Sequence, residues 1–159
     1  MRVGIGYDIH RLVAGRPFRL AGVLLTHPLG PHGHSDGDPL SHAVIDALLG
    51  AAALGDIGQH FPPGNPQWSE APGLDLLQRT LHLVQNAGYQ VHNVDATVIL
   101  EEPRLGPYLG AIRASLAQAL GLPVERVSVK AKSNEGLDAV GRGEAVAVHA
   151  VALLQEVTG

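Results

Sequence analysis

Segments with the apolar pattern of β-strands lie at both ends of this chain, and helical patterns lie between them. Val3 and Ile5 alternate with other residues near the start, as in a strand with one buried face. The predicted strands are short apolar runs bounded by turn residues, and they span residues 2–10, 18–25, 91–100, 126–131 and 144–157. These five segments require a fold that contains a sheet.

Three helices are predicted between these strands. Asp38 before Pro39 marks a helix start. An aspartate side chain accepts hydrogen bonds from the free N–H groups of the first turn. Proline is favoured at the first helical position, because an N–H there would have no partner within the helix. That helix is predicted to end at Gly55, a residue suited to a left-handed cap. Helical spacing predicts the other two helices over residues 74–86 and 109–120.

The element order ββααβαββ predicts an α+β fold, a two-layer sandwich of a mixed sheet with helices on one face. Loops rich in Gly and Pro are expected over 26–38 and 58–73. A length of 159 residues fits a single domain, residues 1–159. Only 4% of the residues are aromatic, so Ala, Val and Leu supply most of the apolar volume. Such a core favours additional burial at an interface between subunits.

The charge of the chain excludes some classes of partner. A net charge of −4 and the lack of a basic face argue against nucleic acid, and the lack of a basic amphipathic helix argues against membrane binding. We expect no transmembrane segment and no signal peptide, since the chain has no 18-residue apolar stretch. The absence of cysteine excludes disulfides and fits a cytoplasmic protein.

Nine histidines in a chain without cysteine indicate a metal site built from imidazole and carboxylate. Asp8 and His10 are two residues apart on a predicted strand, so both side chains leave the same face. This pair alone is weak, and a solvated Asp beside a surface His explains it equally well. His42, in the first turn of the helix capped by Asp38, is the expected third ligand. Three ligands of this type leave a tetrahedral ion one open position, as in catalytic zinc sites.

Asp46 is one helical turn beyond His42 and on the same side. We expect its carboxylate to orient a metal-bound imidazole, which is the usual support of such a ligand. An exposed polar helix face is the alternative interpretation of Asp46.

A second polar group lies further along the chain. The stretch 130–135 places two lysines, Ser133, Asn134 and Glu135 after a strand, and Arg142 follows between two glycines. Cations and a hydroxyl suit a diphosphate, and a carboxylate among them suggests a divalent ion. An ordinary polar loop is the alternative.

Taken together, these phrases resemble the 2-C-methyl-D-erythritol 2,4-cyclodiphosphate synthase family. The resemblance spans nearly the whole chain and depends on residues 6–10, 34–38, 46–58 and 141–144. The stretch 46–58 is the most specific, because so many consecutive matches are not an accident of composition. The resemblance implies a homotrimer whose three active sites lie between neighbouring subunits.

The resemblance also implies roles for individual residues. Zinc would be held by Asp8, His10 and His42, and Mg²⁺ or Mn²⁺ by Glu135 together with the substrate diphosphate. His34 and Ser133 are our candidates for hydrogen bonds to charge that grows in the transition state, and an exposed loop histidine is the alternative for His34. The implied substrate-binding residues are Ser35, Asp56, Ile57, Gly58, Phe61, Leu100, Pro103, Arg104, Leu105, Gly106, Lys132, Asn134 and Arg142. The chain departs from the family at Pro63, where an acidic residue is frequent, and at Ala139, where Phe is frequent.

The implied reaction converts 4-diphosphocytidyl-2-C-methyl-D-erythritol 2-phosphate to the 2,4-cyclodiphosphate and CMP, in the non-mevalonate route to isoprenoid precursors. This is a phosphorus–oxygen lyase reaction by intramolecular phosphoryl transfer. One alternative is a zinc-dependent phosphohydrolase, in which water bound at the same ligands is the nucleophile. Another is a non-enzymatic trimer that binds a ligand in a central channel, but such a scaffold does not require zinc ligands.

Overall fold

The computed structural model describes residues 1–33 and 35–157, and its main sheet has five strands in the order β4-β1-β7-β5-β6. These strands are β1 (Arg2–Ala14), β4 (Leu29–Pro31), β5 (Tyr89–Ile99), β6 (Val127–Lys132) and β7 (Ala145–Glu156). β5 and β6 run parallel, whereas β1 is antiparallel to β4 and β7, and β5 is antiparallel to β7. The predicted mixed sheet is therefore confirmed.

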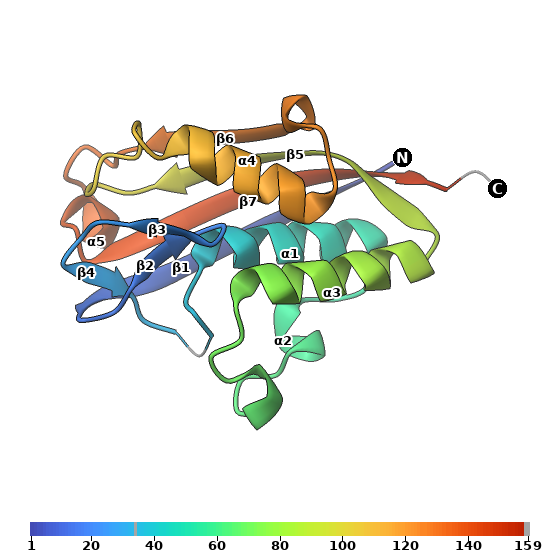
Figure 1. Ribbon diagram of the computed structural model, residues 1–159, viewed down its shortest axis with the longest axis horizontal. Helices are drawn as coiled ribbons and strands as arrows, with labels where there is room; N and C mark the ends of the chain where they lie inside the picture. The colour runs from blue at the N-terminus through green and yellow to red at the C-terminus, as the bar shows by residue number, and fades with distance from the viewer. Residues whose placement is uncertain (34, 158–159) are drawn as a thin grey trace.

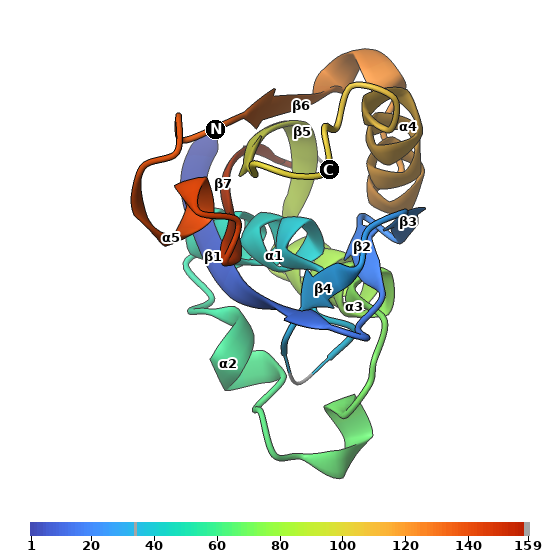
Figure 2. The ribbon, with the colours of Figure 1, turned by 90° about the vertical axis from the view of Figure 1, so that its left-hand side faces the viewer.

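Three long helices lie together on one face of this sheet, as the two ribbon views show (Figures 1 and 2). They are α1 (Pro39–Ala52), α3 (Gly73–Asn86) and α4 (Leu109–Leu120). Short helical turns occupy the connections: α2 (Ile57–His60), η1 (Pro66–Trp68), η2 (Val124–Arg126) and α5 (Asp138–Gly141). The α+β arrangement is thus confirmed. No helix in the described part of the chain is both long and apolar enough to cross a membrane.

The prediction of one strand over 18–25 is wrong. Two strands, β2 (Phe18–Leu20) and β3 (Val23–Leu25), pair as a hairpin instead. Ala21 and Gly22 form its turn with positive φ angles of 47° and 74°. The buried Asp38 carboxylate fixes this turn by accepting hydrogen bonds from the backbone N–H groups of both residues, at 3.0 and 2.8 Å. A contact between residues so distant in sequence leaves no local pattern.

The start of α1 is confirmed, but its predicted end is wrong. The Asp38 side chain accepts a hydrogen bond from the N–H of Ser41 at 3.1 Å, as an N-cap does. The helix ends at Ala53, which takes the left-handed conformation with φ 58°, rather than at Gly55. Sequence patterns also missed β4 in the 26–38 loop and the turns α2 and η1 in the 58–73 loop.

β1 and α1 pack closely because two successive residues on the facing side of the strand, Gly4 and Gly6, are glycines. A Cβ on Gly6 would lie 1.8 Å from the carbonyl oxygen of Ala43, and one on Gly4 would lie 2.1 Å from that of Ala47. Side chains alternate along a strand, so Asp8 follows Gly4 and Gly6 on the same side. The close packing of β1 on α1, called the seam below, therefore continues directly to Asp8, a predicted metal ligand.

We expect Gly6→Ala to destabilise the protein by about 3 kcal/mol or more, because the new methyl group collides with helix backbone that has no free space to move into. Thermal or urea unfolding measures the change. Gly110→Ala is the matched control: Gly110 lies in α4, no atom lies within 4 Å of its Cβ position, and alanine favours helix. Equal stability of the two variants would contradict the close packing of β1 against α1 at Gly6.

Candidate metal centre

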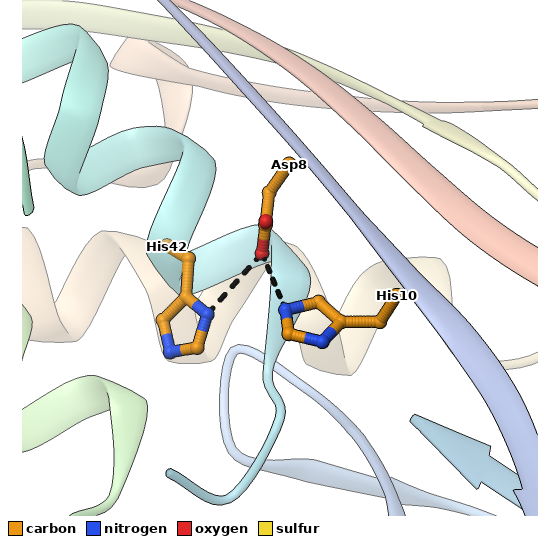
Figure 3. Close-up of side chains that lie close together, drawn as sticks. All are labelled: Asp8, His10 and His42. Carbon is orange, nitrogen blue, oxygen red and sulfur yellow. Dashed lines mark hydrogen bonds and ion pairs between the residues drawn. The ribbon is translucent and has the colours of Figure 1, made fainter. Parts of the chain in front are cut away.

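Asp8, His10 and His42 converge at one point, as Figure 3 shows. Asp8 and His10 come from β1, and His42 comes from the first turn of α1. The Asp8 Oδ2 atom lies 2.8 Å from His10 Nε2 and 3.2 Å from His42 Nδ1. One potential ligand atom from each residue falls within 4.8 Å of the others. The predicted convergence of these three side chains is therefore confirmed.

The donor set fits a zinc ion. Two imidazole nitrogens and one carboxylate oxygen are ligands that zinc accepts, and three protein ligands leave the fourth tetrahedral position open. The exposed fractions of the Asp8, His10 and His42 side chains are 24%, 15% and 12%, so the cluster faces solvent on one side only. An ion held there would remain accessible to a small molecule.

The pKa values within the cluster reflect its burial and its pairing. Burial alone would raise the pKa of Asp8, but hydrogen bonds from His10 and His42 and their charges outweigh burial and lower it to about 2. For His10, burial favours the neutral ring, yet the Asp8 carboxylate raises its pKa above the usual 6.5. The Asp8–imidazole pairs therefore hold the ligand geometry together.

The other nitrogen of each imidazole is also occupied. His10 Nδ1 lies 2.7 Å from the His32 carbonyl oxygen, which fixes the proton on Nδ1 when the ring is neutral. His42 Nε2 lies 2.9 Å from Ser35 Oγ. These contacts leave His10 Nε2 and His42 Nδ1 to face the centre. Sequence analysis missed both partners, because neither a carbonyl group nor a loop hydroxyl carries a sequence signal for this role.

Among the described residues, the Asp46 side chain is hydrogen-bonded to a backbone N–H rather than to an imidazole. Its Oδ1 atom accepts a hydrogen bond from the N–H of Ile57 at 2.8 Å, at the start of α2. Burial and the nearby charges of Asp56 and Asp8 raise the pKa of Asp46, while the bond from Ile57 opposes the shift. Asp46 thus positions α2 beside the cluster, and its carboxylate lines the same cavity.

A cavity of about 460 Å³ opens beside the cluster. Eight of the predicted site residues line it: Asp8, His10, Ser35, His42, Asp46, Ile57, Gly58 and Phe61. Asp56 directly precedes Ile57 in the chain and is the N-cap of α2, where its carboxylate accepts a hydrogen bond from the N–H of Gln59. His34, predicted to be catalytic, lies outside the described residues.

The far wall of the cavity belongs to the loop between α2 and α3, of which sequence analysis named Phe61 and Pro63 but missed the rest. Pro62, Pro63 and Trp68 are among the residues that line it. The Trp68 ring packs edge-on against Phe61 with 5.1 Å between centroids, and the Arg79 guanidinium lies 5.1 Å from the Trp68 ring centre. The single tryptophan of the chain was the available signal.

The other predicted site residues gather at a second place, beyond the parallel ends of β5 and β6. The Leu100 N–H donates to the Lys132 carbonyl oxygen at 2.9 Å, and the Gly136 N–H donates to Glu101 Oε1 at 2.8 Å, so the two loops lie together. This second group comprises Leu100, Pro103, Arg104, Leu105, Gly106, Lys132, Ser133, Asn134 and Glu135, with Arg142 further along the chain. None of these residues lines the cavity beside Asp8.

Within the second group, several polar side chains are already paired. Ser133 Oγ accepts a hydrogen bond from the Glu135 N–H at 3.3 Å, and Asn134 donates to the Asp138 carboxylate at 2.9 Å. Arg142 Nε lies 2.8 Å from Glu144 Oε1. The exposed Glu135 has a positive φ of 54°, so a tight turn presents its carboxylate to solvent.

Comparisons with known proteins agree with this geometry. The model of the YgbB family matches residues 1–155. A 2-C-methyl-D-erythritol 2,4-cyclodiphosphate synthase of Gloeobacter violaceus is 59% identical over 98% of this chain and 96% of its own length. The synthase of the same name from Salinibacter ruber is 54% identical over 98% of this chain and 99% of its own length. A structure of such a synthase in a CDP-bound form superposes with a TM-score of 0.90, at 40% identity, over 97% of this chain and all of its own.

We expect a divalent ion to displace about one proton from His10 at about pH 6 and fewer as the pH rises through the pKa of His10. That pKa is raised, so His10 holds its proton to a higher pH than an ordinary histidine, whereas Asp8 is already ionised. Titration calorimetry with zinc, in buffers of different ionisation enthalpy at about pH 6 and pH 9, counts the protons. A release that does not change with pH would contradict the Asp8–His10 pairing.

Proposed function

The chain belongs to the YgbB family, and we propose that it cyclises 4-diphosphocytidyl-2-C-methyl-D-erythritol 2-phosphate. The products are 2-C-methyl-D-erythritol 2,4-cyclodiphosphate and CMP, which makes the enzyme a phosphorus–oxygen lyase of non-mevalonate isoprenoid synthesis. The observation that carries this proposal is the convergence of Asp8, His10 and His42 at the edge of the 460 Å³ cavity. We further propose that one domain, residues 1–159, supplies all of the protein groups, and that the enzyme acts in the cytoplasm, in keeping with a chain without cysteine.

The proposed reaction forms one phosphorus–oxygen bond and breaks another. An oxygen of the substrate's 2-phosphate attacks the β-phosphorus, and CMP leaves with the electrons of the broken bond. The attacking oxygen is ionised near neutral pH, so the step needs no strong protein base. The main obstacle is repulsion between the two anions, which the protein must offset by positioning and by local positive charge.

The metal cluster and its cavity act on the 2-phosphate end of the substrate. We propose that Asp8, His10 and His42 hold zinc, which when bound supplies positive charge and one position for a phosphate oxygen. The cavity wall at Ile57 and Gly58 holds the polyol close to that position. Holding two reacting groups in one orientation lowers the barrier by up to roughly 7–11 kcal/mol.

The second group acts on the nucleotide end. We propose that the backbone of residues 100–106 holds cytosine, as suits the CDP-bound relative. Lys132 and Arg142 bring positive charge to the diphosphate, and Glu135 holds Mg²⁺ or Mn²⁺ beside it. Ser133 donates a hydrogen bond to charge that grows during transfer, and His34 is proposed to do the same from the other end of the substrate.

We propose that three copies of the chain assemble, with each active site built between two of them. The two residue groups do not share a cavity within one chain, which supports a site completed by a neighbour. The sheet face opposite the helices also needs a partner. Val3, Ile5, Tyr7 and Ile9 on β1 are 47–71% exposed there, and Val151 on β7 is 42% exposed. Such an apolar stripe is typical of an interface between subunits.

We expect His42→Ala to lose its zinc and to lower CMP release about 100-fold or more, because two ligands hold the ion poorly. Elemental analysis and an assay of CMP from the proposed substrate measure both effects. His82→Ala, at an exposed position of α3, is the control.

Turnover in ¹⁸O-labelled water separates cyclisation from hydrolysis, since label in the phosphate product would establish a phosphohydrolase. A wild-type chain that binds its ligand equally well without metal and releases no CMP would favour a non-enzymatic scaffold.

Sites shared between subunits predict complementation. His42→Ala and Glu135→Ala are each expected to be nearly inactive. Mixing equal amounts after reversible dissociation is expected to restore about a quarter of the wild-type rate, because one random pairing in four joins two intact half-sites. Mixing His42→Ala with Asp8→Ala is the matched control. It restores nothing, since both changes fall in the same half-site. A rate that recovers in the control mixture alone, or in neither mixture, would overturn the proposal that each active site is shared between two subunits.

A further inference from the structure

Described residues of the loop between β4 and α1, Pro31–Gly33 and Ser35 (the 31–35 loop below), contact both imidazoles of the candidate metal centre. Its His32 carbonyl oxygen is the partner of His10 Nδ1 at 2.7 Å, and its Ser35 Oγ is the partner of His42 Nε2 at 2.9 Å. Ser35 is buried, and the N–H of Gly37 also donates to its Oγ at 3.3 Å. The direction in which each ring points therefore depends on where this loop lies.

Arg16 is the side chain that holds the loop in place. It follows β1 at the turn toward the β2–β3 hairpin and is half-buried. Its Nε atom donates to the Pro31 carbonyl oxygen at 3.4 Å, and its Nη2 atom donates to those of Gly33 and Ser35, each at 3.3 Å. One planar guanidinium thus contacts three carbonyl oxygens on the same short segment.

Among the described residues, further hydrogen bonds hold the two flanks of this segment. The His32 N–H donates to the Arg11 carbonyl oxygen at 2.8 Å, which continues the edge of the sheet. Beyond the segment, the Asp36 carboxylate accepts a hydrogen bond from the Gly73 N–H at 2.9 Å. Among the described residues, Arg16 is the hydrogen-bond donor to the carbonyl oxygens of Gly33 and Ser35, and Gly33 itself lies against the His10 ring.

We propose that Arg16 is a positioning residue for the metal ligands. It fixes the 31–35 loop, and the loop in turn fixes His10 through a carbonyl group and His42 through a hydroxyl group. This inference rests on the zinc site of the proposed function. Arginine suits the task because its donors point in several fixed directions and it keeps its charge at every physiological pH. Lysine carries the same charge but lacks the planar fork.

The test is zinc affinity, measured by competition with a chromophoric chelator on purified protein. Arg16→Ala is expected to weaken zinc binding about 10- to 100-fold, the range found when the partners of metal ligands are removed. Arg16→Lys is expected to restore only part of the loss. The visible spectrum of the Co²⁺-substituted protein is expected to change in band position, because the imidazoles turn.

The matched control is Arg19→Ala, which removes a half-buried arginine that donates to the Gly22 carbonyl oxygen at 3.2 Å in the neighbouring hairpin. The Arg19→Ala variant is expected to keep wild-type zinc affinity.

A double variant shows whether Arg16 acts through the loop. If it does, Arg16→Ala with Ser35→Ala binds zinc more tightly than the sum of the two separate losses predicts. Fully additive losses, or wild-type affinity and spectrum in Arg16→Ala, overturn the inference. If Arg16→Ala fails to fold, Arg16→Lys decides the question in the same way, with its thermal unfolding as the check. Failure of the wild-type chain to bind zinc would instead overturn the metal site of the proposed function.

Discussion

The contact on which the structure depends most is the seam between β1 and α1. Gly4 and Gly6 let the strand lie directly on the helix backbone, with no side chain between them. The next residue on that side of β1 is Asp8, and the first turn of α1 presents His42 to it at 3.2 Å. A wider spacing between strand and helix would separate carboxylate from imidazole. Backbone packing therefore sets the distance on which the metal chemistry relies.

Local patterns predicted the parts of the site that lie on regular elements. Alternation along β1 placed Asp8 and His10 on one face, and the Asp38–Pro39 cap placed His42 at a helix start. Both were right, because they depend only on the periodicity of a strand and on the first turn of a helix. The same reasoning predicted α4 at its observed bounds and the mixed sheet with helices on one face.

The parts that were missed depend on contacts between residues far apart in sequence. The apolar pattern predicts one strand over 18–25, but the Asp38 carboxylate, which precedes α1, fixes a turn in its middle. Asp46 was assigned to an imidazole, yet it accepts from the Ile57 N–H, because α1 and α2 meet at that point. The residue that supports His42 is Ser35, in a loop whose path no periodicity describes. Sequence spacing identifies ligands more readily than it identifies what holds them.

The candidate metal ligands and the opposite wall of the cavity belong to different segments of the chain. The metal ligands lie on β1 and α1, whereas the opposite wall is the loop from Pro62 to Ser69, which contains no metal ligand and is mostly exposed. Mutations in that loop can therefore reshape the cavity while the glycine seam and the three ligands stay in place. A mutant library aimed at changing the shape of this cavity would best be confined to those eight positions.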